Sequence, residues 1–101
     1  MQLSPQQIEL IRSYFSNQPV LKIYLFGSYV RGEGHADSDI DLLVELDHSR
    51  PIGLAFIKMK LELEKLLSKK VDLISTRGLS KYIRPIIEKE KTLIYARQVG
   101  R

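Results

Sequence analysis

The sequence contains no cysteine, which excludes disulfide bonds and thiolate metal sites and is typical of a protein from a reducing compartment. It also lacks any run of 18 or more apolar residues, so no segment is long enough to form a transmembrane helix. The N-terminus has neither the basic nor the apolar region of a secretory signal peptide. These absences together predict a soluble, cytoplasmic protein with no membrane partner.

Aromatic residues are also few, at 8% of the chain, and the sequence contains no RNA-binding motif. The net charge of +4 is unevenly distributed: residues 1–50 hold four Lys and Arg against seven Asp and Glu, whereas residues 51–101 hold twelve against five. The basic half can attract a triphosphate, RNA or an acidic partner surface. Its lysines are equally typical of solvated helix faces, and without stacking aromatics the sequence does not favour nucleic-acid binding.

The chain has 101 residues, 44% of them apolar, and we expect a single domain spanning residues 1–101. Hydrophobic patterns predict helices at 5–17, 52–68 and 79–90, and strands at 20–26, 40–46, 71–74 and 92–96. Pro85 either kinks the last helix or starts a fresh segment, and residues 97–101 are expected to fray. This order predicts an α/β (α+β) fold in which a mixed sheet of about four strands has helices packed mainly on one face.

The helix predicted at 52–68 carries apolar residues on two opposite faces. The face expected to pack against the sheet consists of Ile52, Phe56, Met59, Leu63 and Leu66. The opposite stripe, which so small a domain cannot bury, consists of Leu54, Ile57 and Leu61. This stripe predicts a surface for a partner or for a homo-oligomer, unless the three are simply scattered exposed residues, which are common. In the last helix, the predicted core face consists of Leu79, Ile83, Ile86 and Ile87.

A Gly-Ser pair followed at fixed spacing by Asp-x-Asp is the most informative pattern in the chain. Gly27 and Ser28 directly follow the first predicted strand, and Asp39 and Asp41 open the second one, with ten residues between Ser28 and Asp39. Either pattern alone is usually a turn, a solvated loop or a helix cap. Together, each at the edge of a predicted strand, they arise by chance in about one chain in a thousand of this length. The combination therefore points to a functional site.

The chemistry of phosphate transfer suits this arrangement. Side chains alternate along a strand, so Asp39 and Asp41 point to the same face and can bridge two Mg²⁺ ions roughly 3.5–4 Å apart. Mg²⁺ prefers one or two carboxylates together with waters and substrate phosphates. Gly27 lets the backbone approach a phosphate, and a helical turn starting at Ser28 directs N–H groups at the anion. Arg31, one turn further on, can clamp a phosphate in bidentate fashion.

The Gly-Ser pair, the ten-residue spacing, the Asp-x-Asp and an Arg-Gly three residues after the serine resemble the signature of the nucleotidyltransferase superfamily that includes DNA polymerase beta. The most similar form is its minimal one, the MntA-like antitoxins encoded beside HEPN toxins, and the resemblance covers nearly the whole chain. It implies a polymerase-beta-like core, in which Ser28 and Arg31 contact the nucleotide triphosphate beside Gly27. It also implies that Asp39 and Asp41 bind metal ions together with a third carboxylate.

Asp72 is the candidate for this third carboxylate. It is the one acid in the short apolar strand 71–74, where an unpaired buried charge would be costly. The resemblance implies that Asp72 binds metal and acts as the general base for the acceptor hydroxyl. By contrast, His35, His48 and Asp37 are expected to be ordinary loop residues.

The resemblance implies a nucleotidyltransferase that uses two Mg²⁺ ions and ATP. It would transfer AMP to a hydroxyl, a tyrosine, of a HEPN-type toxin and so act as its antitoxin. No sequence remains after the predicted core to hold an acceptor, so we expect the acceptor on another chain or on a second copy. One alternative is a binding module that neutralises its partner by contact alone. Another is an enzyme acting on a small-molecule hydroxyl, for which no acceptor pocket is evident.

Overall fold

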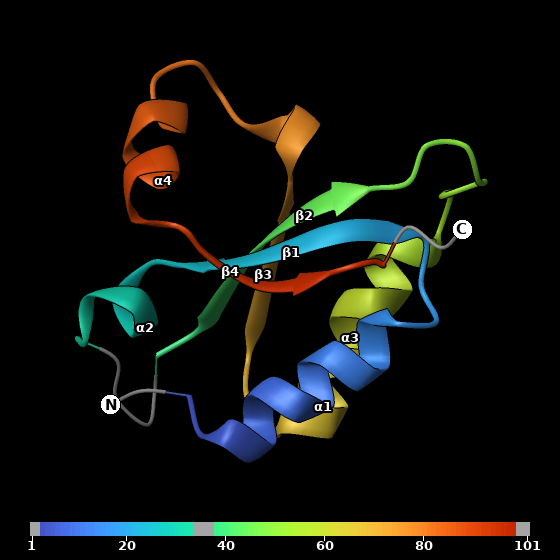
Figure 1. Ribbon diagram of the computed structural model, residues 1–101, viewed down its shortest axis with the longest axis horizontal. Helices are drawn as coiled ribbons and strands as arrows, with labels where there is room; N and C mark the ends of the chain where they lie inside the picture. The colour runs from blue at the N-terminus through green and yellow to red at the C-terminus, as the bar shows by residue number, and fades with distance from the viewer. Residues whose placement is uncertain (1–2, 34–37, 99–101) are drawn as a thin grey trace.

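A four-stranded mixed sheet forms the centre of the computed structural model, which describes residues 3–33 and 38–98 (Figure 1). The strands are β1 (Val20–Phe26), β2 (Ile40–Leu46), β3 (Val71–Ser75) and β4 (Thr92–Ala96), and they lie in the order β3-β2-β1-β4. β1 runs antiparallel to both β2 and β4, whereas β2 and β3 are parallel. The predicted α/β class and the mixed four-stranded sheet are confirmed.

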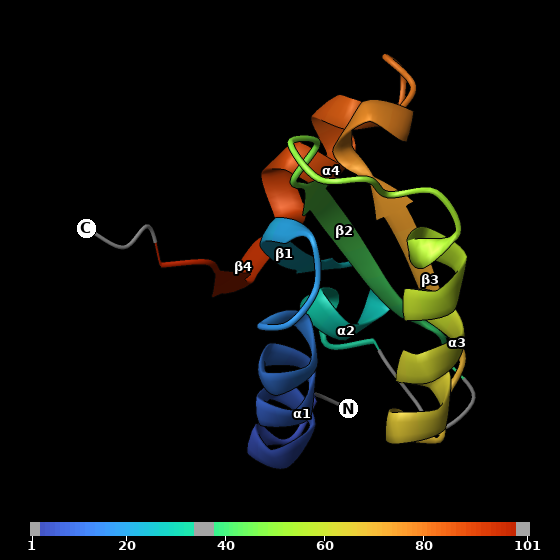
Figure 2. The same ribbon diagram turned by 90° about the vertical axis from the view of Figure 1, so that its right-hand side faces the viewer.

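The helices are α1 (Pro5–Phe15), α2 (Ser28–Arg31), α3 (Ala55–Leu67) and α4 (Arg84–Glu90), with a 3₁₀ turn η1 (Thr76–Gly78) after β3. The two long helices, α1 and α3, lie together on one side of the sheet, and α4 lies on the other (Figures 1 and 2). The main layer is therefore on one face, as predicted, and α4 partly covers the opposite face.

The main core lies between the sheet and the pair α1 and α3. Its fully buried side chains come from both layers and include Ile11, Phe15, Ile23, Ile40, Leu42, Val44, Met59 and Leu63. A smaller cluster on the opposite face consists of Phe26, Leu43, Leu79 and Ile87. Because β2 contributes to both clusters, it is buried from both sides, as its apolar sequence predicted. This central strand carries Asp41 into the functional site.

α1 begins at a capping box that the Ser4-Pro5 pair predicted. The Ser4 hydroxyl accepts the N–H of Gln7 at 3.1 Å, and the Gln7 side chain accepts the N–H of Ser4 at 2.8 Å. Pro5 occupies the first turn, where its missing N–H costs nothing.

α3 begins at Ala55 and not at residue 52, because Gly53 adopts a left-handed φ of 45° that no α-helix contains. Ser68, with φ of 53°, ends the helix after Leu67. The predicted core face is correct for Met59 and Leu63. It is wrong for Leu66, which is 45% exposed, while its neighbour Leu67 is buried.

The prediction of a helix at 79–90 is wrong in its first half. α4 starts at Arg84 with Pro85 in its first turn, so the proline starts a fresh segment, one of its two predicted outcomes. Leu79 is buried from the preceding loop and Ile87 from α4, but Ile83 and Ile86 are exposed. The predicted core face fails at Ile83 because residues 79–83 are not helical. Ile86 lies within α4 but on its exposed side, since Ile87 is the buried residue of that helix.

The chain near its C-terminal end is held more firmly than predicted. Arg97 donates its backbone N–H to the carbonyl of Leu21 at 2.8 Å, and its guanidinium forms an ion pair with Asp47 at 2.7 Å. The expectation of a frayed tail is therefore wrong at Arg97. Residues 99–101, like the predictions for His35 and Asp37, lie outside the described residues. None of the helices in residues 3–33 and 38–98 combines the length and hydrophobicity needed to span a bilayer.

Candidate nucleotidyltransferase site

Three carboxylates singled out by the sequence meet at the end of the sheet where β2 and β3 begin. The parallel register pairs Asp41 on β2 with Asp72 on β3, so their side chains point to the same face. Asp39 stands two residues before Asp41, just ahead of β2, and strand alternation directs it to that face as well. This end of β2 lies near α2, at the left of Figure 1. The tertiary structure thus brings Asp72 to the Asp-x-Asp pair from a distant part of the chain.

The surroundings of Asp41 raise the pKa of its carboxyl group. The pKa of the half-buried Asp41 carboxyl is raised to about 6, mainly by burial and also by the negative charges of Asp72 and Asp39. The guanidinium of Arg31 has the opposite, smaller effect. The ionised form of Asp41 therefore lacks enough positive charge around it in the free protein.

Asp72 is exposed, which corrects the prediction that it is a buried charge in an apolar strand. β3 is an edge strand of the sheet, so the side chain of Asp72 reaches solvent although both its neighbours in sequence are buried. Asp39 is exposed too, and Asp41 is the most enclosed of the three. The three carboxylates therefore face an open end of the sheet that a substrate can reach.

Gly27 allows Asp41 to lie against the turn that follows β1. Gly27 has φ of 81°, and a Cβ at this position would collide with Oδ2 of Asp41. Asp41 is also the β-sheet partner of Phe26, the residue just before the turn. The sequence predicted that Gly27 admits a phosphate; the close contact that the structure records at Gly27 is with the Asp41 carboxylate. The glycine and the aspartate therefore form one unit of the site.

α2 is a single helical turn that places Ser28 and Arg31 beside this unit. Ser28 is the first residue of α2, and the turn is closed by the N–H groups of Val30 and Arg31, which donate to the carbonyl of Gly27 at 3.1 and 3.2 Å. Gly32 ends α2 in a left-handed conformation, with φ of 76°. Arg31 does not extend freely into solvent: its Nε bonds Glu33 at 3.0 Å and its Nη1 bonds Glu90 at 2.9 Å. The phosphate-clamp role of Arg31 stays a prediction.

Glu90, the last residue of α4, belongs to the site and was missed in the sequence. Its Oε2 accepts the backbone N–H of Gly27 at 2.7 Å, while its Oε1 holds Arg31. Its negative charge also contributes to the raised pKa of Asp41. The sequence offers no local signal for this role, because Glu90 lies 59 residues from Arg31 and resembles any acid on a helix surface.

Mg²⁺ fits the chemistry of this carboxylate group. A divalent cation would neutralise the crowded charges that raise the pKa of Asp41, and carboxylate oxygens are its preferred protein ligands. In the part of the chain that the structure describes, no three His, Asp or Glu side chains are gathered tightly enough to enclose a metal by themselves. An open set of carboxylates completed by waters and substrate phosphates is the usual way in which proteins bind Mg²⁺.

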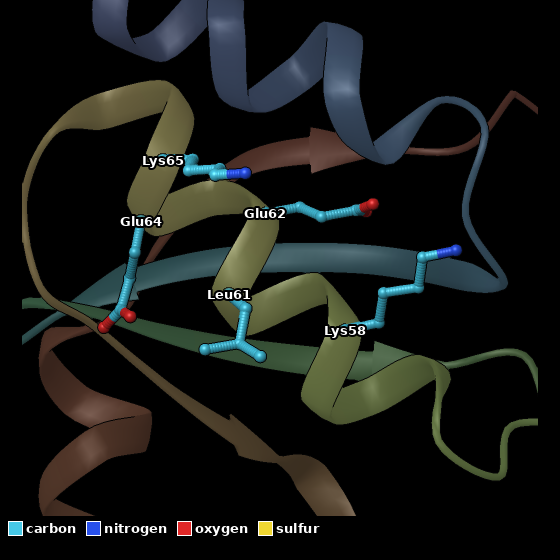
Figure 3. Close-up of a pocket in the computed structure, with 5 residues that line it drawn as sticks. All are labelled: Lys58, Leu61, Glu62, Glu64 and Lys65. Carbon is cyan, nitrogen blue, oxygen red and sulfur yellow. The ribbon is translucent and has the colours of Figure 1, made fainter.

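The outer face of α3 is the other notable surface. The three apolar side chains predicted to be unburied are exposed: Leu54 by 81%, Ile57 by 57% and Leu61 by 56%. Beside Leu61 lies an open groove of about 540 Å³, lined by charged side chains of both signs, which Figure 3 shows on α3: Lys58, Glu62, Glu64 and Lys65. This face belongs to the layer formed by α1 and α3 (Figure 2).

Carboxylates on neighbouring strands beside a glycine turn are typical of enzymes that use divalent metals to act on phosphate groups. The comparison with known families is more specific. The chain belongs to the nucleotidyltransferase domain family, whose model matches residues 6–95. The match includes every residue of the site, from Gly27 to Glu90.

Several known proteins are similar to this chain. The protein adenylyltransferase MntA of Thermococcus cleftensis is 42% identical over 71 residues, which cover 70% of this chain and 71% of that protein. A solved minimal nucleotidyltransferase is 36% identical with a TM-score of 0.74, over 86% of this chain and 88% of that one. A complex of a tri-AMPylated HEPN toxin with its MNT antitoxin from Shewanella oneidensis matches with a TM-score of 0.67 over 90% of this chain and 71% of that one. At 22% identity, this last match shows the shared fold alone.

Proposed function

We propose that this nucleotidyltransferase transfers AMP from Mg²⁺-bound ATP to a tyrosine hydroxyl of a HEPN-type partner protein and thereby acts as its antitoxin. The observation that carries the proposal is the register of β2 and β3, which sets Asp72 beside the Asp39 and Asp41 pair next to the Gly27 turn. The charge that crowds Asp41 is what a Mg²⁺–nucleotide complex would relieve.

Each residue of the site has a defined task in this reaction. Gly27, Ser28 and Arg31 would bind and orient the triphosphate, with Arg31 holding charge on the departing pyrophosphate. Asp72, exposed at the sheet edge, would accept the proton of the acceptor hydroxyl. The hydroxyl oxygen forms a bond to the α-phosphorus as the bond from that phosphorus to the bridging oxygen breaks, and pyrophosphate leaves.

Asp39, Asp41 and Asp72 would hold two Mg²⁺ ions at the open end of the sheet. When bound, these ions supply positive charge for the triphosphate and make the acceptor hydroxyl more acidic. Few further protein groups are needed, because nucleotidyl and phosphoryl transfer depend mainly on positioning and charge stabilisation.

A protein acceptor is supported by the relatives of this chain. The 42%-identical MntA is a protein adenylyltransferase, and the Shewanella oneidensis neighbour is an antitoxin bound to an AMPylated HEPN toxin. By analogy, we assign a HEPN-type protein as the acceptor here. We place the reaction in the cytoplasm because its nucleotide substrate is a cytoplasmic metabolite.

The test is a transfer assay with purified protein, Mg²⁺, α-labelled ATP and a HEPN-type partner from the same organism. We expect the wild-type chain to label the partner. A partner whose tyrosines are changed to phenylalanine should receive no label. Asp72→Asn should lower the rate by about 10²–10⁴-fold, the usual contribution of a general base. Asp39→Asn/Asp41→Asn should abolish transfer while the variant still folds, as circular dichroism would show.

Two results would contradict the proposal. Transfer retained by the Asp39→Asn/Asp41→Asn variant would exclude these carboxylates as the catalytic group. Neutralisation of the partner by the same variant, with no label on the partner from the wild type, would instead establish an antitoxin that acts by contact alone.

A further inference from the structure

We propose that Glu90 is a positioning residue of the nucleotide site, which fixes both the Gly27 turn and the Arg31 guanidinium in the arrangement that receives the triphosphate. This inference rests on the proposed function. Its basis is that one carboxylate contacts both groups: Oε2 of Glu90 lies 2.7 Å from the Gly27 nitrogen and Oε1 lies 2.9 Å from Nη1 of Arg31.

The contact to Gly27 takes the place of a backbone hydrogen bond between β1 and β4. The antiparallel pairing of β1 with β4 ends at Leu25 opposite Thr92, so the same register continued would set Gly27 opposite Glu90. At that point the chain belongs to α4 and its backbone is helical, so it offers no strand partner to Gly27. The side chain of Glu90 accepts the N–H of Gly27 in its place, and Gly27 is buried. Removing this acceptor would leave a buried donor unpaired.

The contact to Arg31 determines where the guanidinium lies. Arg31 has two acidic partners, but the side chain of Glu33 is 64% exposed, whereas that of Glu90 is only 18% exposed. Ion pairs between exposed groups restrain a side chain weakly. The less exposed Glu90 therefore supplies the firmer restraint, and it connects Arg31 to the same backbone turn that Asp41 packs against.

Glu90 also couples α4 to the site. α4 packs on the sheet through Ile87, which is buried against Phe26 and Leu43. Ile87 and Glu90 are three residues apart and so lie on one side of the helix. Apolar packing therefore fixes the helix, the helix fixes the carboxylate, and the carboxylate fixes Gly27 and Arg31.

The test measures binding of a non-cleavable ATP analogue with Mg²⁺ and, separately, KM and kcat for transfer. Glu90→Ala should weaken nucleotide binding and raise KM by about tenfold, the factor that corresponds to one lost charge-assisted hydrogen bond, with little change in kcat. Glu90→Gln keeps an acceptor for the Gly27 N–H and should recover part of the affinity. In an Arg31→Ala background, Glu90→Ala should reduce nucleotide affinity by a clearly smaller factor than it does in the wild type.

Glu88→Ala is the matched control. Glu88 is a carboxylate of the same helix, 45% exposed, that pairs with Lys91 at 2.7 Å. This variant should bind the nucleotide as the wild type does. A merely structural role for Glu90 would lower the unfolding temperature and leave KM unchanged, which overturns the proposal.

Tighter nucleotide binding by Glu90→Ala would also overturn the proposal, because Glu90 would then compete with the triphosphate for Arg31. These outcomes are distinct from failure of the proposed function. If the variants weaken nucleotide binding as expected but no partner is labelled, the transfer reaction fails and the role of Glu90 stands. If the wild-type chain binds no nucleotide, both proposals fail.

Discussion

Gly27 has two reasons to be glycine, and they can be separated by experiment. Its φ of 81° is strained for any other residue, and its missing Cβ leaves room for the Asp41 carboxylate. Gly32 has a similar φ of 76°, but a Cβ there would meet nothing within 4 Å. Gly32 is therefore a partial control: it shares the positive φ and lacks the close contact, but its ψ is 14°, whereas that of Gly27 is −154°.

We expect Gly27→Ala to destabilise the protein by about 1–3 kcal/mol through backbone strain, and by more because of the clash with Asp41. Gly32→Ala should cost only the strain, of order 1 kcal/mol. Urea unfolding of the two variants measures the difference. Equal losses of stability would show that the contact between Gly27 and Asp41 has no energetic weight.

The crowded Asp41 predicts a response to metal and pH. Because its folded pKa is raised to about 6, its protonated form stabilises the fold at low pH, and this stabilisation is lost as the pH rises through about 6. At pH 7.5 without metal, the ionised carboxylate therefore destabilises the protein. Asp41→Asn should unfold at a higher temperature than the wild type in EDTA, and the gap should narrow as the pH falls below about 6 and close below about pH 4, the unfolded value.

Mg²⁺ should reverse this effect in the wild type. Saturating Mg²⁺ should raise its unfolding temperature by about 5 °C or more, since 1 kcal/mol corresponds to about 4–8 °C in a domain of this size. The shift should be much smaller in Asp41→Asn. Thermal denaturation with and without Mg²⁺ measures this shift in the wild type and in Asp41→Asn. Equal shifts in the two proteins would show that Mg²⁺ binds away from Asp41.

At the scale of the element, α3 has one face in the core and another in solvent. Met59 and Leu63 are fully buried, whereas Leu54, Ile57 and Leu61 are exposed. Of these three, Leu61 lines the groove shown in Figure 3. Three neighbouring apolar side chains on one helix face favour a contact with another protein surface. The same stripe was predicted from the helical wheel, but its use as an interface stays a prediction.

The triple variant Leu54→Glu/Ile57→Glu/Leu61→Glu tests this interface. We expect it to fold and to change either the oligomeric state or the affinity for the partner by at least about tenfold, because each buried leucine contributes about 1.5–3 kcal/mol. Light scattering and a binding titration measure the two quantities. Leu10→Glu, at a 41% exposed leucine of α1, is the control. The interface does not exist if the triple variant and this control behave alike.

For the whole molecule, the contact between Arg97 and Asp47 ties the end of β4 to the end of β2. Hydrogen bonds from Ser49 and Arg97 lower the pKa of Asp47 to about 2. A carboxyl with a lowered folded pKa contributes stability above its unfolded value of about 3.9, and this contribution is lost as the pH falls through about 2.

Asp47→Asn should therefore lower the unfolding temperature at pH 7 and flatten its dependence on pH between about 4 and 2. Arg97→Gln should give the same direction at pH 7 with a smaller effect, because the contact with Ser49 remains. Circular dichroism melts across this pH range measure both effects. If the unfolding temperature of Asp47→Asn falls between about pH 4 and 2 as it does in the wild type, other carboxylates control acid unfolding.

Most helices and strands, and the local part of the site, could be predicted from sequence patterns. Strand alternation placed Asp39 and Asp41 on one face, and the capping serine and proline set the start of α1. These features depend on neighbours within a few residues, so pattern and spacing suffice. Errors arose where a single backbone angle or a packing choice decided the outcome. Gly53 delays α3, and Leu67 replaces Leu66 in the core.

The distant groups that surround the site follow from the folding of the whole chain. The parallel register brings Asp72 to Asp41, and the edge position of β3 leaves Asp72 exposed although its sequence pattern predicted burial. The join of α4 to β4 brings Glu90 to Gly27 and Arg31, a contact that no local pattern encodes. The physical reason is that sheet register and strand order come from packing of the whole chain, whereas periodicity reports only which face of an element is apolar.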